Sequence, residues 1–379
     1  MWKLGFVALV AVTVIDAKFF SFGPTIGGDQ RKREFNVYWN VPTFVCHKYG
    51  MNFEEAHRDF GIIQNRNDAF RGDRFAILYD PGMFPALLKD KSGEVVKRNG
   101  GVPQKGNLSR HLETFTQHLK TQIPNEDFFG IGVIDFESWR PIFRQNWASL
   151  KPYKDLSIKL VHKEHPQWSD KAVEREAAAR FEKNGVKFMF ETMQLAKSLR
   201  PNATWGYYAY PYCFNLTPSQ PGSKCDARTM DENDEMTWLF KDEDVFLPSV
   251  YIRKELSKSE RVGLVEGRVR EATRVAKKLH PNALILAYHW FKYQDDRDSY
   301  LTTEDLEATM QMISRAGAHG AIIWGSSDDV NTKEKCQKLK EYLNDVMGPI
   351  IVKVRKSAAQ KSILDYADGN ALENVTNSD

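Results

Sequence analysis

Two carboxylates, Asp135 and Glu137, end an apolar run that begins at Ile131. Side chains alternate along a β-strand, so residues two apart point to the same face. Two carboxylates on one face repel each other and lose hydration, and both effects raise the pKa of a carboxyl group. Because a general acid needs a raised pKa, we expect catalysis here. The structural alternative is an ion pair with Arg140 or another cation.

Aromatic and polar residues follow the other apolar runs of the chain as well. A core packed only for stability would favour Val, Ile and Leu there, whereas aromatic faces stack on sugar rings. Each tyrosine alone would be ordinary packing, but with the carboxylate pair the set favours a saccharide-binding cleft. The residues are Trp39, Asn40, Tyr79, Asp80, Tyr207, Tyr208, Tyr210, Tyr251, Tyr288, His289, Trp290, Trp324, Ser326 and Asp328.

The position of the pair restricts the mechanism. Ordinary glycosidases place two carboxyl groups on opposite sides of the scissile bond, which two residues on one strand face cannot easily do. In substrate-assisted catalysis, Glu137 would protonate the leaving oxygen and later activate water. Asp135 would hold the 2-acetamido group of the substrate, whose carbonyl oxygen is the nucleophile. The pair therefore predicts an N-acetylhexosamine at the cleaved position.

The elements that position these residues alternate between strands and helices. Strands are expected at 35–41, 74–80, 131–134, 204–210, 245–251, 283–290 and 320–327, with Pro248 making the fifth irregular. Helices are expected at 107–122, 170–199 with an interruption near Gly185, 257–279 and 303–316. This alternation of strand and helix, repeated about seven times, predicts an α/β fold in which a parallel sheet with covering helices is closed into a barrel. A dinucleotide-binding open sheet is disfavoured because the first strand is followed by no Gly-x-Gly-x-x-Gly sequence. In such a barrel, active sites form at the carboxyl ends of the strands.

Composition and charge exclude few classes of protein. The chain has 379 residues, of which 42% are hydrophobic and 27% charged, as in a soluble globular protein. The formal net charge is only +3, and no long basic run suggests nucleic-acid binding. No histidine or cysteine spacing predicts a metal site, and no motif calls for a cofactor.

The termini and sequons favour secretion. Residues 1–17 have the charged start, apolar core and small final residue of a signal peptide, and no later segment is long and apolar enough to span a membrane. We therefore divide the chain into the signal peptide 1–17, a lead 18–34, a catalytic barrel 35–354 and a polar, disordered tail 355–379. The four glycosylation sequons begin at Asn107, Asn202, Asn215 and Asn374.

Four cysteines in a secreted chain suggest two disulfides, for which three pairings exist. Cys213 and Cys225 flank a turn-rich loop that could close locally, which leaves Cys46 with Cys336. Cys46 and Cys336 follow the first and last expected strands, which are neighbours in a closed barrel.

Several blocks of sequence together resemble the hyaluronidases of glycoside hydrolase family 56, most closely the insect, bee-venom type. The blocks are FNVYWNVPT from Phe35, ILYDPG from Ile77, VIDFESWRP from Val133, WGYY from Trp205 and IWGSS from Ile323. The resemblance covers residues 35–352. It implies an α/β fold, a single distorted TIM-like (β/α) barrel of about seven parallel strands, and endo-hydrolysis of hyaluronan at β-1,4 bonds after N-acetylglucosamine.

The resemblance also implies roles for individual residues. Glu137 would be the acid/base, and Asp135 would position the acetamido group. It implies the disulfides Cys46–Cys336 and Cys213–Cys225. Matching cleft positions are Tyr208, Tyr251, Trp324, Arg140 and Arg268, and weaker matches are Tyr79, Asp80, Ser326 and Ser327. The arginines would bind the glucuronate carried by every second sugar of hyaluronan.

Two alternatives remain open at this stage. One is an endoglycosidase that also or instead cuts chondroitin or chitin-like chains. The other is a secreted glycan-binding protein that retains the cleft without catalysis. No oligomeric state is predicted.

Overall fold

The structure is a computed structural model, and it describes residues 34–360. The expected signal peptide, the lead except for Glu34, and the sequon at Asn374 lie outside these residues.

The predicted α/β fold with seven parallel strands is confirmed. β1, β9, β8 and β7 form one hydrogen-bonded sheet, and β2, β5 and β6 form a second. The strands are β1 (Asn36–Asn40), β2 (Phe75–Tyr79), β5 (Ile131–Asp135), β6 (Thr204–Tyr207), β7 (Val245–Phe246), β8 (Leu284–Trp290) and β9 (Gly320–Trp324). All pairings within these two sheets are parallel, so the carboxyl ends of the strands open on one face.

The two sheets face each other as a barrel that is not closed by a continuous hydrogen-bonded ladder. Between β6 and β7, the backbone nitrogen of Ala209 donates to the carbonyl of Leu247 at 3.0 Å. Between β1 and β2, the gap is filled by the chain around Ile63, which exchanges backbone hydrogen bonds with Val37 and Trp39 at 2.7 and 2.8 Å. The barrel is therefore distorted at two seams, one on either side of the three-stranded sheet that carries the carboxylates.

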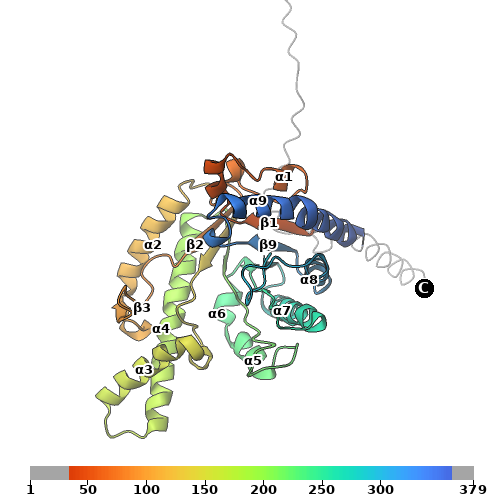
Figure 1. Cartoon of the computed structure of the whole chain (residues 1–379). Helices are drawn as coiled ribbons and strands as arrows, with labels where there is room; N and C mark the ends of the chain where they lie inside the picture. The colour runs from red at the N-terminus through yellow and green to blue at the C-terminus, as the bar shows by residue number, and fades with distance from the viewer. Residues whose placement is uncertain (1–33, 361–379) are drawn as a thin grey trace, which may run out of the picture.

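Helices cover the outside of the barrel (Figure 1). α2 and α4 lie on one side, α7 and α8 on the other, and α9 lies beside β1. The labelled α-helices of residues 34–360 are α1 (Glu55–Arg58), α2 (Leu108–Gln122), α3 (Lys151–Glu164), α4 (Asp170–Leu199), α5 (Ala227–Glu235), α6 (Thr237–Phe240), α7 (Lys258–Leu279), α8 (Thr303–Arg315) and α9 (Lys333–Tyr342). A short antiparallel hairpin, β3 (Ala86–Lys89) and β4 (Val95–Arg98), follows β2.

Several expectations need correction. α4 runs through Gly185 without interruption. An added side chain at Gly185 would contact the ring of Trp139 at 3.3 Å, so the glycine allows close packing rather than breaking the helix. β7 is only two residues long, since Pro248 has no N–H to donate, although Val250 still donates to Tyr288 at 2.9 Å. The chain stays helical to residue 360, beyond the expected end of the domain at Val354. The sequence analysis missed the β3–β4 hairpin and α1, α3, α5, α6 and α9.

Both predicted disulfides are present. Cys46 and Cys336 join the turn after β1 to α9, which follows β9, with a Cα separation of 5.8 Å. Cys213 and Cys225 close the loop after β6, with a Cα separation of 5.1 Å. The first bridge links the two ends of the barrel across 290 residues of sequence.

Candidate active site

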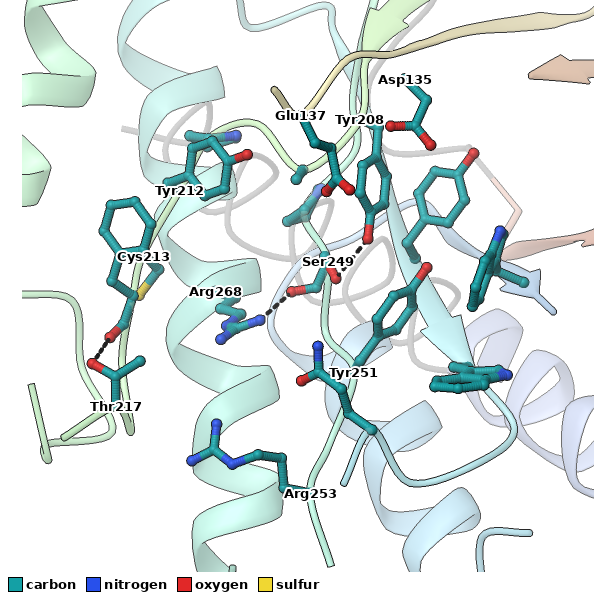
Figure 2. A pocket seen from close by; sticks show the side chains of 18 of the residues that line it. Asp135, Glu137, Tyr208, Tyr212, Cys213, Thr217, Ser249, Tyr251, Arg253 and Arg268 are labelled. Carbon is teal, nitrogen blue, oxygen red and sulfur yellow. Dashed lines mark hydrogen bonds between the residues drawn. The ribbon is translucent and has the colours of Figure 1, made fainter. Parts of the chain in front are cut away.

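The carboxylates Asp135 and Glu137 lie at the mouth of the barrel. Asp135 is the last residue of β5 and is level with Tyr79 of β2. Both carboxylates line a cavity of about 520 Å³ at the carboxyl ends of the strands. Figure 2 shows them on the same side of this cavity, above the ring of Tyr208. The expected common orientation of the pair is confirmed.

Buried aromatic residues next to the pair in the sequence anchor it from behind. Phe136, between the two carboxylates, is 2% exposed and stacks on Phe84 with ring centroids 3.9 Å apart. Trp139 packs edge-on against Phe136 at 4.8 Å and donates its indole N–H to the carbonyl of Pro85 at 2.8 Å. These contacts fix the turn after β5, so the carboxylates are held at the cavity by the packing of their neighbours.

Neither carboxylate has a hydrogen-bond or ion-pair partner within residues 34–360. Burial raises the pKa of Asp135 well above its usual value, and the negative charges of Glu137 and Asp80 raise it further. The pKa of Glu137 is also raised, chiefly because the cleft walls remove hydration, while the positive charge of Arg140 opposes the shift. The pair therefore favours holding a proton that it can deliver to a bound substrate.

Aromatic side chains form one wall of the cavity. Tyr251 stacks on Trp324 with ring centroids 5.6 Å apart, and Trp290 meets Trp324 edge-on at 5.3 Å. The hydroxyl of Tyr208 donates to Ser249 Oγ at 3.2 Å, as drawn in Figure 2. These rings present the apolar faces and fixed hydroxyls that a sugar ring requires.

Arg140 and Arg268 also line the cavity, as the resemblance implied. The guanidinium of Arg140 lies 4.7 Å from the centroid of Tyr212 and 4.9 Å from that of Phe214. Arg140 donates through Nη1 to the carbonyl of Gln145 at 2.7 Å, and its buried Nε has no partner.

Arg268 is anchored at two points. Its Nε donates to Asn215 Oδ1 at 3.0 Å, and its Nη1 donates to the carbonyl of Ser249 at 2.7 Å. Burial lowers its pKa to about 10, so the side chain still carries its charge at neutral pH. No carboxylate of residues 34–360 neutralises it, which leaves its charge available to an anionic ligand.

The weaker matches divide into two groups. Ser326 lines the cavity, whereas Tyr79, Asp80 and Ser327 are absent from its lining. Asp80 is held by Arg98 of the β3–β4 hairpin, whose Nη2 donates to Asp80 Oδ1 at 2.8 Å. The hydroxyl of Tyr79 accepts from Trp324 Nε1 at 2.9 Å. Tyr79 is 41% exposed and lies beside the cavity through its bond to Trp324. Asp80 acts on the site through its negative charge, which raises the pKa of Asp135.

Several residues named for the cleft face away from it. Trp39 stacks on Phe53 with ring centroids 6.1 Å apart. Tyr207 donates its hydroxyl to the carbonyl of Met189 at 2.8 Å, and His289 Nε2 lies 2.9 Å from Thr309 Oγ1. The alternation along each strand explains this, because their neighbours Tyr208, Tyr288 and Trp290 line the cavity.

Asp329, which the sequence analysis missed, organises the far side of the cleft. Its Oδ2 accepts from Trp290 Nε1 at 3.0 Å, from the backbone nitrogen of Ser326 at 2.8 Å and from Ser326 Oγ at 3.1 Å. Its Oδ1 pairs with Lys292 Nζ at 2.9 Å. The spacing of Ser326 and Asp329 is that of a capping box, so the signal was present in the sequence.

Other cleft residues come from loops with no periodic pattern, and for these the sequence offers no signal of position. They are Trp147, Tyr212, Phe214, Ser249, Arg253, Gln294 and Arg297. Arg297 adds a positive charge to those of Arg140 and Arg268, whereas Arg253 is paired with Glu255 at 2.7 Å.

The sequons differ in exposure. Asn107 is exposed and caps α2 by accepting from Arg110 N, and Asn202 is exposed as well. Asn215 is 0% exposed, and its amide donates to the carbonyls of Ser223 and Leu264 at 2.6 and 3.2 Å. The prediction of a glycan at Asn215 conflicts with this geometry, because a glycan on that nitrogen would have no space beside Arg268.

Residues 34–360 contain no group of three or more His, Cys, Asp or Glu side chains placed to hold a metal ion. None of their helices has the length and apolarity needed to cross a membrane.

Comparisons with known proteins agree with the site. The family model described as hyaluronidase, glycoside hydrolase family 56, matches residues 27–366. A hyaluronidase of Apis mellifera is 59% identical over 348 residues, covering 91% of both chains. The crystal structure of bee venom hyaluronidase in complex with a hyaluronic acid tetramer superposes with a TM-score of 0.84 at 62% identity, covering 85% of this chain and 99% of that one.

One relative shows that the family includes proteins described as inactive. Inactive hyaluronidase B of Vespula vulgaris is 44% identical over 335 residues, covering 88% of this chain and 98% of its own. Family membership rests on the match along nearly the whole chain, and activity must rest on the residues of the site. The chain belongs to the hyaluronidase family of glycoside hydrolases, family 56.

Proposed function

We propose that this protein is an endo-β-N-acetylhexosaminidase that hydrolyses hyaluronan at the β-1,4 bond between N-acetylglucosamine and glucuronate. The observation that carries the proposal is the carboxylate pair. Asp135 and Glu137 have raised pKa values, have no hydrogen-bond or ion-pair partner within residues 34–360, and line a cleft walled by Tyr208, Tyr251 and Trp324. A structural ion pair would have placed a cation against them.

In the first step, the glycosidic bond breaks with help from the substrate. Glu137 gives its proton to the glycosidic oxygen, which leaves with the electron pair of the bond to C1. The carbonyl oxygen of the 2-acetamido group forms the new bond to C1, which produces a positively charged five-membered ring. Asp135 lies beside Glu137 and stabilises that charge through the amide N–H.

In the second step, water completes the reaction. Glu137, now ionised, takes a proton from a water molecule whose oxygen bonds to C1, and the bond from C1 to the acetamido oxygen breaks. Glu137 is protonated again, the acetamido group is restored, and the configuration at C1 is retained.

The charges of the cleft favour an anionic polysaccharide. Arg140, Arg268 and Arg297 line the same cleft as the carboxylates and match a uronate on alternate sugars. Chitin-like chains carry no charge and would leave these arginines without ligands. Chondroitin has the same alternation of uronate and acetylated hexosamine, and the arginines suit it equally.

The cellular setting proposed is extracellular. The signal-like residues 1–17, the exposed sequons at Asn107 and Asn202, and two disulfides suit a secreted protein. Secretion also matches an enzyme whose substrate is a matrix polysaccharide.

A digestion experiment tests the proposal. Purified protein is incubated in parallel with high-molecular-weight hyaluronan, chondroitin and chitin oligomers, and chain length and reducing ends are followed. We expect rapid shortening of hyaluronan, with N-acetylglucosamine at the new reducing ends and retained configuration. Binding of hyaluronan without shortening would instead identify a non-catalytic glycan-binding protein.

A further inference from the structure

A second hollow, of about 340 Å³, lies beside the cleft. The loop after β5 separates the two, because Arg140 and Trp147 line the cleft whereas Phe143 and Arg144 line the hollow. The first turns of α4 form one wall, and α5 contributes Arg228. Figure 1 shows α3, the beginning of α4 and α5 at the same end of the molecule.

The hollow is rich in positive charge, and we call it the basic groove. Its cationic lining residues are Arg144, Lys154, Lys171, Arg175 and Arg228. Two of these are neutralised, since Arg144 Nη2 donates to Glu232 at 2.5 Å and Arg228 lies 3.6 Å from the same carboxylate.

The other three cations of the basic groove are not neutralised by the protein. Within residues 34–360, no carboxylate oxygen lies within 4.0 Å of Lys154, Lys171 or Arg175. The lining also holds two glutamates, Glu174 and Glu182, of which Glu182 accepts from the backbone nitrogen of Phe143 at 2.8 Å; five cationic residues outnumber them. The groove therefore keeps positive charge that folding does not use.

The arrangement along α4 produces this charge on one face. Lys171, Arg175 and Ala178 recur at spacings of four and three residues, so they lie one above the other. Like charges four residues apart destabilise a helix slightly, so helix formation does not explain them. Ala178 is small and leaves the groove open. From Lys171 to Glu182 the helix rises about 16 Å, enough to follow an extended chain.

We infer that the basic groove binds the part of an anionic polysaccharide strand that extends beyond the cleft. The inference rests on the proposed function, because an endo-acting enzyme holds a long strand on both sides of the cut. Repeated uronates of that strand would meet Lys171 and Arg175. The ring of Phe143, with Lys154 Nζ 5.5 Å from its centroid, offers an apolar face to a sugar.

The test compares two charge-reversing double variants of α4. The first, Lys171→Glu with Arg175→Glu, changes the basic groove. The control, Lys183→Glu with Lys187→Glu, changes the same total charge at the same spacing on exposed positions outside the groove. Each variant is assayed on high-molecular-weight hyaluronan and on a short oligosaccharide that fills only the cleft.

We expect the groove variant to raise KM for the polymer about 3- to 10-fold, with kcat and the oligosaccharide kinetics unchanged. Its KM should also depend less on salt than that of the wild type. The control should match the wild type. Equal KM values of the two variants for high-molecular-weight hyaluronan would overturn the inference. Binding of both variants to heparin, a sulfated polyanion, is measured as well, and a groove variant that loses affinity for heparin but keeps its KM for hyaluronan would also overturn it.

A binding measurement separates this inference from the proposed function. If the wild type cleaves no hyaluronan, the proposed function fails, yet fluorescence anisotropy with labelled hyaluronan chains still reports on the groove. Weaker binding by the groove variant than by the control would then support the groove alone.

Discussion

Asp135 and Asp329 are both acidic residues at the mouth of the barrel, and they have opposite surroundings. Asp329 is 3% exposed and receives three hydrogen bonds from Trp290 and Ser326 in addition to the Lys292 ion pair. Asp135 receives none, and its nearest charges include two other carboxylates. The charge of Asp329 is therefore neutralised within the fold, whereas Asp135 remains available to contact a ligand.

The different surroundings of Asp135 and Asp329 give the two residues different effects on the stability of the fold. A buried charge with good partners holds its neighbours in place, and breaking the set is costly. A charge without partners destabilises the fold and is kept where a substrate supplies the missing contacts. Substitutions at the two sites should therefore have opposite signs of effect on stability.

The largest effect is expected on the activity, when the proposed general acid Glu137 is replaced. Glu137→Gln keeps the shape of the side chain but cannot transfer a proton, so kcat on hyaluronan should fall about 10²- to 10⁴-fold. The fold should be intact by circular dichroism, and binding of hyaluronan oligosaccharides should persist. Turnover at the wild-type rate would remove Glu137 from its assigned role.

The next largest effect is expected on stability, when the hydrogen-bonded carboxylate of Asp329 is replaced. Asp329→Asn leaves Lys292, which is 5% exposed, without its anion, and should cost about 2–3 kcal/mol in the free energy of unfolding. It should also loosen Trp290 and Ser326, raising KM more than it lowers kcat.

Denaturant unfolding and steady-state kinetics measure both parts. Replacing Lys292 by Gln in the same chain should recover part of the loss, because the unpaired charge is removed. An unchanged unfolding midpoint for Asp329→Asn would contradict the role assigned to the network.

The smallest effect is expected for Asp135→Asn, which should stabilise the fold rather than destabilise it. The pKa of Asp135 is raised in the folded state, so between its ordinary value of 3.8 and the raised value the folded chain binds more protons than the unfolded chain. Stability therefore falls as pH rises through that window. Asp135→Asn cannot ionise, so it should be about 1 kcal/mol more stable than the wild type at neutral pH.

At a pH below the ordinary pKa of a carboxyl group, the gain in stability from Asp135→Asn should vanish, because Asp135 is then neutral in both the folded and the unfolded state. Thermal unfolding at pH 3 and pH 7 measures the difference. Activity should be lost at both values. A variant less stable than the wild type at neutral pH would show that Asp135 has partners in the folded protein.

The sequence predicted the catalytic pair and the strands well, because both depend on local patterns. Alternation placed Asp135 and Glu137 on one face, and the apolar runs located all seven strands. Irregular loops carry the rest of the cleft. Arg253 and Arg297 reach the cavity from loops whose paths are set by distant contacts, such as the ion pair of Lys254 with Asp296 at 2.6 Å. Asp80 shows the same limit, since its partner Arg98 comes from a hairpin that the sequence analysis missed.

The disulfide between Cys46 and Cys336 has a consequence for resistance to proteolysis. Because it spans 290 residues, a protease that cuts any exposed loop between these cysteines produces two pieces that stay covalently tethered. The cut ends remain near each other, and the strands of both pieces can stay paired in the barrel. In a fluid that contains proteases, a nicked molecule would keep its cleft and its activity until the bridge is reduced.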